Sequence, residues 1–183
     1  MKTRISWIFY CLVSFMLLPS LSGAERFVTN ESNGFTWIQQ GKAYPILVDS
    51  QEDKGVLRAV ANLQTDAGKV TGATPEIIHS PSGNRILIVG SVENSSWIKQ
   101  LVQAGKIPAA DLKGKREKYI LQTVKQPVEG VEEAIVIAGS DKRGTIYGIY
   151  ELSRQMGVSP WYFWADVPVE KHDIISIKEG VYT

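Results

Sequence analysis

The stretch 135–168 constrains the fold most strongly, because a buried strand, a tight turn and a helix follow one another in it. Residues 135–138 are apolar and mostly β-branched, which is typical of a strand buried on both faces. Residues 139–141 (Gly-Ser-Asp) interrupt this strand, and either the serine or the aspartate can cap a helix. Gly157 occupies a position that suits the glycine after a helix end. Between these limits, apolar residues recur at helical spacing: Ile146, Ile149, Tyr150, Leu152 and Met156.

Two features of this helix lower its stability, which is unexpected in a purely structural element. Lys142 and Arg143 place two cations in the first turn, where they oppose the helix dipole. A helix N-terminus with two added cations is suited to hold an anion or a carboxylate. Gly144 and Gly148 lie four residues apart, and each costs ~1 kcal/mol relative to alanine inside a helix. We therefore expect the backbone to pack very closely against a neighbour at these glycines.

The rest of the chain alternates strand and helix patterns. Strand patterns cover 35–38, 43–48, 76–79, 85–90, 119–124, 133–139 and 174–177. The first two are expected to form a hairpin around Gly41. A helix is predicted from Val56 to near Gly68 and another over 95–104. This order predicts an α/β domain with a small mixed β-sheet flanked by two to three helices.

The first 24 residues have the pattern of a secretory signal peptide. Lys2 and Arg4 precede an apolar stretch over 5–18, and small residues at 22–24 offer a cleavage site. The stretch is shorter than the roughly 20 apolar residues that a membrane span needs. We therefore expect an exported protein, periplasmic or secreted, with no membrane attachment after cleavage.

Charge and cysteine content exclude several functional classes. Lys2 and Arg4 belong to the leader, so 18 of the 20 basic residues remain against 19 acidic ones. This balance gives no electrostatic reason to expect nucleic acid as a partner. The single cysteine, Cys11, also lies in the leader, so the sequence after it offers no disulfide and no cysteine nucleophile. His79 and His172 have no second ligand close by in sequence, and no metal site is predicted.

Several motifs together resemble glycoside hydrolase family 115, the xylan α-1,2-glucuronidases. The resemblance is carried by residues 139–150 (GSDKRGTIYGIY), 157–162 (GVSPWY) and 165–168 (ADVP), and it extends upstream through 86–90, 104–106 and 112–115. Members of this family begin with a small α/β domain, like that of several hexosaminidases and glucuronidases, and a (β/α)₈ catalytic barrel follows.

The leader pattern and the resemblance together imply three regions in this chain. They are the signal peptide (1–24), an N-terminal α/β domain (25–168) and a linker to the barrel (169–183). A barrel needs about 250 residues, so it is expected beyond Thr183, together with the catalytic carboxylates. No catalytic residue, cofactor or metal is therefore assigned here. The implied partners are the missing barrel in cis and, through the parent enzyme, glucuronoxylan or its oligosaccharides.

Lys142 and Arg143 are the first candidate site residues. They are placed to reach a uronic acid carboxylate, or to shape the edge of the cleft where this domain meets the barrel. The alternative is that they pair with nearby acidic residues such as Asp141 and Glu151.

An aromatic run supplies the other candidates, Trp161, Tyr162 and Trp164, with Asp166 just after them. Their rings are suited either to stack on sugars or to pack between two domains, and we then expect them to be exposed in this domain alone. Asp166 either caps the following loop or bonds across the domain boundary.

The sequence is compatible with two other functions. The chain can be a stand-alone carbohydrate-binding module that uses the aromatic run, or a purely structural α/β domain of another carbohydrate-active enzyme. Retention on a glucuronoxylan column distinguishes the first from the second.

Overall fold

The computed structural model describes residues 25–183, apart from the side chains of Ala109 and Phe163. The predicted signal peptide, residues 1–24, and Cys11 within it lie outside the described residues. Within 25–183, no helix combines the length and the apolar character that crossing a bilayer requires.

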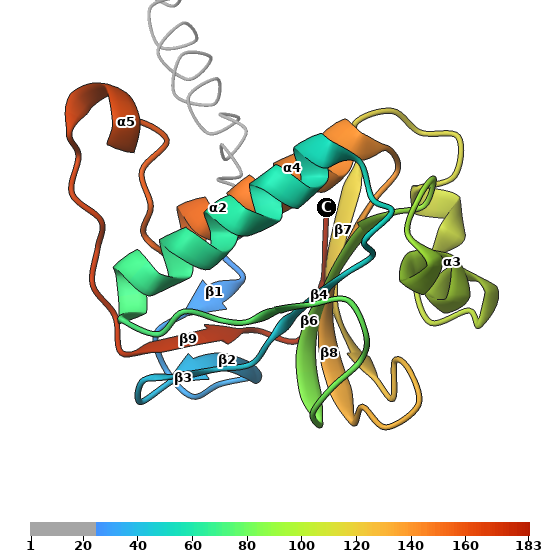
Figure 1. Cartoon of the computed structure of the whole chain (residues 1–183), viewed down its shortest axis with the longest axis horizontal. Helices are drawn as coiled ribbons and strands as arrows, with labels where there is room; N and C mark the ends of the chain where they lie inside the picture. Colours follow the sequence, from blue (N-terminus) through green and yellow to red (C-terminus); the bar gives the residue numbers. More distant parts are fainter. Residues whose placement is uncertain (1–24) are drawn as a thin grey trace, which may run out of the picture.

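Two β-sheets form the framework (Figure 1). The six-stranded sheet has the order β10-β7-β8-β6-β4-β5, and the four-stranded sheet has the order β1-β9-β2-β3. The strands of the larger sheet are β4 (Ile46–Val48), β5 (Ile77–Ile78), β6 (Arg85–Ser91), β7 (Tyr119–Lys125), β8 (Glu133–Gly139) and β10 (Val181–Tyr182). Those of the smaller sheet are β1 (Val28–Thr29), β2 (Phe35–Gln39), β3 (Lys42–Ala43) and β9 (Ile174–Ile177).

The centre of the larger sheet is parallel and its β10 edge is antiparallel. Strands β8, β6, β4 and β5 run parallel, whereas β7 runs antiparallel to β8 and β10 antiparallel to β7. In register, Val48 lies beside Val89, and Val89 lies beside Ile137; all three are fully buried. Burial on both faces explains the continuous apolar runs of the central strands.

Helices cover both faces of the larger sheet (Figure 1). Helices α2 (Lys54–Thr71) and α4 (Lys142–Met156) pack side by side on one face, over a core shared with the four-stranded sheet. Helix α3 (Ser96–Gln103) and the short turn η2 (Ala109–Asp111) accompany the other face, which has a separate core. A last short helix, α5 (Tyr162–Ala165), lies on a loop that extends away from both sheets. This architecture confirms the predicted α/β class, with two sheets where one was expected.

The predicted partner strand of the first hairpin, 43–48, is divided between the two sheets. Its start forms β3, which pairs with β2, and its end forms β4, which enters the larger sheet. Pro45 lies at the division and has no N–H to continue a ladder. Its carbonyl instead accepts a hydrogen bond of 2.9 Å from the Leu87 N–H of β6.

Residues 169–183, expected to be a linker, contribute strands to both sheets. β9 lies between β1 and β2 in the smaller sheet, and β10 pairs with β7 at the edge of the larger one. The segment therefore belongs to the folded domain. Local sequence could predict β9 as a strand, but its pairing with β1 joins opposite ends of the chain.

The close approach expected at the α4 glycines is present. A Cβ atom at Gly144 would lie 2.1 Å from the Lys118 carbonyl oxygen, and one at Gly148 would lie 2.8 Å from the Ile137 side chain and 3.0 Å from the Tyr119 ring. Lys118 and Tyr119 lie at the start of β7, and Ile137 lies on β8. Glycine at these positions therefore allows α4 to lie directly on the sheet.

Candidate functional site

Lys142 and Arg143 are exposed at the start of α4, and both have acidic partners. The Lys142 ammonium lies 3.9 Å from the Asp53 carboxylate, and the Arg143 guanidinium lies 3.0 Å from that of Glu117. The side chains of both cations are 59% exposed. The proposed partners Asp141 and Glu151 are replaced by Asp53 and Glu117, since the carboxylates of Asp141 and Glu151 bind other groups.

Asp141 caps the helix that carries these cations. Its carboxylate accepts 2.8 Å hydrogen bonds from the N–H groups of Gly144 and Glu117. Burial raises the pKa of Asp141, but these bonds, together with Arg143, outweigh burial and hold the pKa below its usual value. The first turn of α4 is thus already bound to an internal carboxylate, which weakens the case for an external anion there.

A second internal carboxylate fills the place where α/β sheets usually bind ligands. The chain leaves β4 for β5 on one side and returns as β6 on the other, so the carboxyl ends of β4 and β6 form a topological switch point. We call this place the switch-point crevice. The 4%-exposed Glu52 occupies it and accepts hydrogen bonds from the Ser91 N–H (2.8 Å), the Ser91 hydroxyl (2.9 Å) and the Asp53 N–H (3.0 Å).

Asp49 completes the closure of the switch-point crevice. Its carboxylate accepts hydrogen bonds from the N–H (2.9 Å) and the hydroxyl (2.5 Å) of Ser96, at the start of α3. Burial opposes ionisation, but the bonds from Ser96 and from the Gln51 N–H lower the pKa of Asp49. The donors that would hold a phosphate in other α/β proteins are therefore bound to the chain's own carboxylates.

The loop that bears α5 exposes two large aromatic rings. We call residues 157–173 the tryptophan loop. Trp161 is 65% exposed and Trp164 is 85% exposed, as expected for this domain alone. Two exposed tryptophans on one short loop form an apolar surface of the kind that is typical of contact sites.

Tyr162 and Asp166 are placed differently from the two tryptophans. Tyr162 is half-buried against the main core, with the Lys69 ammonium 4.2 Å from the centre of its ring. Asp166 is exposed and follows α5 with a left-handed backbone (φ 49°). Tyr162 therefore helps to anchor the tryptophan loop, and Asp166 ends its short helix.

A hollow of about 470 Å³ lies against α4. We call it the α4 hollow. It is lined by Asp66 of α2, Tyr119 of β7, residues 158–160, and five α4 residues: Tyr147, Tyr150, Glu151, Ser153 and Arg154. Tyr147 and Tyr150 are 42% and 45% exposed. Tyr150, predicted to be part of the apolar core face, therefore turns toward solvent, where its hydroxyl accepts a 2.8 Å hydrogen bond from the Asn62 amide.

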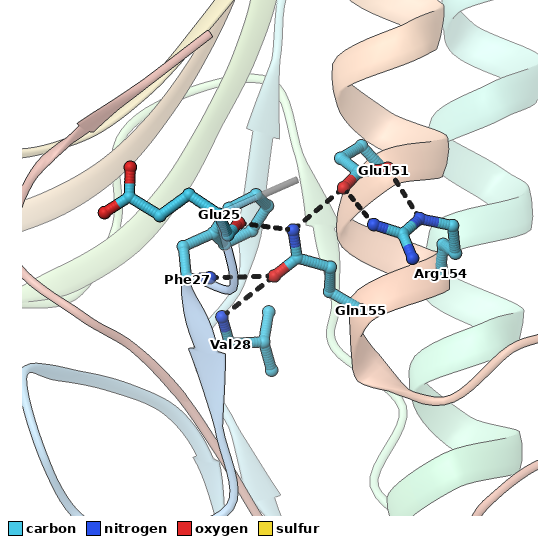
Figure 2. Close-up of polar contacts among 6 residues, drawn as sticks. All are labelled: Glu25, Phe27, Val28, Glu151, Arg154 and Gln155. Carbon is cyan, nitrogen blue, oxygen red and sulfur yellow. Dashed lines mark hydrogen bonds and ion pairs between the residues drawn. The ribbon is translucent and has the colours of Figure 1, made fainter. Parts of the chain in front are cut away.

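One side of the α4 hollow is held by a network of polar contacts (Figure 2). Arg154 donates two hydrogen bonds to Glu151, of 2.8 and 2.5 Å, and the amide of Gln155 donates a third of 2.8 Å. The bond from Arg154 lowers the pKa of Glu151, against the effect of partial burial. The same Gln155 side chain binds the backbone of Phe27 (2.8 Å) and Val28 (3.2 Å), and donates to the Glu25 carbonyl (3.1 Å). The orientation of Glu151 is thus fixed by the first described strand.

Burial perturbs two further groups in the α4 hollow. Burial raises the pKa of Asp66, against the lowering effects of Ser153 and Lys69. Burial and the negative charge of Glu151 raise the pKa of the Tyr119 hydroxyl, which remains a proton donor at neutral pH. Perturbed groups in a hollow are typical of binding sites.

The α4 hollow was not predicted from the sequence. The signal available was the spacing of Tyr147, Tyr150 and Arg154, which places them on one face of α4 beside Glu151. Asp66 and Tyr119 come from elements far away in sequence, so only the fold brings them to that face.

Comparisons with known proteins agree with this fold. A family model described as "Glycosyl hydrolase family 67 N-terminus" matches residues 36–152. A family GH115 4-O-methyl-α-glucuronidase with specificity for decorated arabinogalactans has 34% sequence identity over 80% of this chain, with a TM-score of 0.64. The chain covers only 18% of that protein's length.

More distant structures have lower sequence identity and lower TM-scores. A Streptomyces plicatus β-hexosaminidase has 14% identity and a TM-score of 0.44, over 82% of this chain and 23% of its own. The protein CpGH84D has 9% identity and a TM-score of 0.46, over 86% of this chain and 24% of its own. No curated protein sequence matches the chain.

Proposed function

The chain belongs to the family of N-terminal domains described as "Glycosyl hydrolase family 67 N-terminus", and we propose its function from this membership. It is an N-terminal domain of the kind found in glycoside hydrolases of the glucuronidase type. The proposal is that its parent is an exported α-glucuronidase resembling family 115. The observation that carries it is the 34% identity with a family GH115 enzyme over 80% of this chain.

The parent would hydrolyse the bond between (4-O-methyl)glucuronic acid and the backbone of glucuronoxylan. Such chemistry uses two carboxylates on either side of the scissile bond. In residues 25–183, three carboxylates with low exposure serve the fold: the buried Glu52 and the half-buried Asp49 close the switch-point crevice, and the half-buried Asp141 caps α4. This supports a catalytic pair in a further domain of the parent, expected as a (β/α)₈ barrel.

The tryptophan loop would pack against that barrel. Trp161 and Trp164 offer apolar surface on a segment that lies apart from both sheets. Burial of large aromatic rings supplies much of the energy at such contacts. The alternative is that the same rings stack on the sugar substrate.

Lys142 and Arg143 remain candidates for the edge of the active-site cleft. Their pairing with Asp53 and Glu117 supports local charge neutralisation over direct binding of a uronic acid. Replacement of Arg143 by Gln in the parent is therefore expected to leave activity within about threefold of the wild type. A loss of more than about a hundredfold, with unchanged stability, favours the direct role.

The decisive test is an assay of the full-length parent. The enzyme is incubated with glucuronoxylan and, separately, with a glucuronate-decorated arabinogalactan, and the released uronic acid is measured by anion-exchange chromatography. Release from glucuronoxylan is the expected result. Release from arabinogalactan alone contradicts the xylan assignment, and release from neither contradicts the α-glucuronidase proposal.

A double replacement, Trp161→Ala with Trp164→Ala, tests the role of the tryptophan loop in the parent. Interdomain packing predicts a lower unfolding temperature and a lower kcat, whereas sugar stacking predicts a higher KM at unchanged stability. The matched control is Trp97→Ala, because Trp97 belongs to α3 and packs against the core on the other face of the larger sheet.

A further inference from the structure

We propose that the α4 hollow binds a neutral oligosaccharide. The choice of sugar class rests on the proposed function. The site itself is inferred from the groups that line the hollow, and it is tested on this chain alone.

The size and walls of the α4 hollow suit a short sugar chain. Its volume of about 470 Å³ lies within the range of small-molecule sites. Tyr147 and Tyr150 stand three residues apart on α4 with their rings partly exposed. Aromatic rings can pack against the apolar face of a sugar ring. The Tyr147 and Tyr150 hydroxyls accept hydrogen bonds from Arg143 and Asn62, and each keeps an O–H that can donate to a sugar.

The polar groups of the hollow favour a ligand that supplies hydrogen-bond donors. The Asp66 side chain is 9% exposed, and that of Glu151 is 20% exposed. Glu151 is already bound to Arg154 and Gln155, so the cost of covering the hollow with an apolar side chain falls on Asp66, whose paired Lys69 lies 3.9 Å away. Sugar hydroxyls supply donors to Asp66, so a saccharide suits both the rings and this carboxylate.

The charges of the hollow favour a neutral sugar over a uronic acid. Arg154 is already bound to Glu151 through two hydrogen bonds. Arg143, beside the hollow, donates to the Tyr147 hydroxyl (2.8 Å) and pairs with Glu117. The other carboxylate of the lining, Asp66, is paired with Lys69 at 3.9 Å. Among the described residues that line the hollow, the one cation, Arg154, is therefore already paired, so a uronate carboxylate would approach Asp66 and Glu151 without an unpaired cation to hold it.

The α4 wall of the hollow is closely packed against the sheet. Gly144 and Gly148 seat α4 directly on β7, and Gln155 fixes Glu151 from behind (Figure 2). A site built on firmly packed elements loses little conformational freedom on binding.

The experiment titrates the purified protein with xylotetraose, β-1,6-galactotetraose and glucuronic acid, and follows backbone amide shifts by NMR. A neutral tetrasaccharide is expected to shift the amides of Tyr147, Tyr150 and Glu151, whereas glucuronic acid leaves them unchanged. Shifts centred on Trp161 and Trp164, equal binding of glucuronic acid, or no shift with any sugar would overturn the proposal. Shifts that depend on protein concentration without sugar indicate self-association at this face and also overturn it.

Variants sharpen the assignment. Tyr147→Ala is expected to weaken binding about tenfold through loss of ring contact, and Asp66→Asn about fivefold through loss of a charged acceptor. Trp164→Ala is the matched control, an exposed aromatic residue outside the hollow that should leave affinity unchanged. A circular dichroism melt of each variant establishes that it is folded. Unchanged affinity in folded Tyr147→Ala and Asp66→Asn contradicts the site. Because uronic acid release by the parent is measured separately, failure here leaves the α-glucuronidase proposal standing.

Discussion

The switch-point crevice and the α4 hollow differ in how their carboxylates are used. In the crevice, Glu52 is buried and bound to donors of the protein itself. In the hollow, Glu151 is also bound to donors of the protein, but Asp66 is buried with a raised pKa beside Lys69, and two tyrosine rings that line the hollow are partly exposed. The usual ligand position of an α/β sheet has thus become structural in this domain. Recognition is better sought on the outer surface of α4 and on the tryptophan loop.

The largest expected effect comes from emptying the switch-point crevice. Glu52→Ala leaves the Ser91 N–H, the Ser91 hydroxyl and the Asp53 N–H without their acceptor. We expect the free energy of unfolding to fall by about 3–4 kcal/mol, since each buried unpaired donor costs about 1–3 kcal/mol. Urea denaturation followed by circular dichroism measures this change.

The α4 hollow provides the control for that experiment. Tyr147→Ala removes a ring that is 42% exposed and should lower the free energy of unfolding by less than about 0.5 kcal/mol. If Glu52→Ala and Tyr147→Ala lowered the free energy of unfolding equally, the crevice could not be distinguished from the hollow as a structural site.

A smaller loss is expected where α4 meets β7. Gly144→Ala would place a methyl group 2.1 Å from the Lys118 carbonyl oxygen, so the helix must shift. We expect a loss of about 2–3 kcal/mol from overpacking, although alanine is the better helix former by ~1 kcal/mol. Thermal denaturation measures the loss. In the control, Gly55→Ala, the nearest atoms lie 3.1 and 3.5 Å away and belong to side chains. A stabilised Gly144→Ala variant would show that α4 has freedom to move, and with it the walls of the hollow.

An effect smaller than that of Gly144→Ala is a dependence of stability on pH. The folded-state pKa values of Asp141 and Glu151 are lowered, so their contribution is present above the unfolded-state pKa values and is lost as pH falls through the folded values. The raised pKa of Asp66 acts in the opposite sense, since its protonation stabilises the fold. Urea denaturation between pH 6 and pH 2 should therefore show a declining free energy of unfolding. In Asp141→Asn this decline should be smaller by about 1 kcal/mol, and an unchanged profile contradicts the capping role.

Local sequence predicted the central strands, α4 and the need for Gly144 and Gly148. These features depend on apolar runs and helical spacing, which residues near in sequence determine. The division of 43–48 between two sheets was missed because it depends on where Pro45 lies relative to β6, a contact between distant segments. Tyr150 was misassigned because a tyrosine at helical spacing fits both a core and a surface position.

The candidate site was predictable only in part. The aromatic run indicated exposed rings, and the exposure of Trp161 and Trp164 agrees with that expectation. The partners of Lys142 and Arg143 were not predictable, because Asp53 and Glu117 lie on loops that reach α4 only in the folded domain. The role of these cations stays a prediction.

The pairing of β1 with β9 sets a condition on synthesis by the ribosome. Val28 lies opposite Ile177, so one of the earliest described residues finds its partner among the last. A nascent chain therefore holds β1 without its neighbour until nearly all of the domain has left the exit tunnel. Completion of this fold is tied to translation of its final strands, and the emerging polypeptide must be kept from aggregating until then.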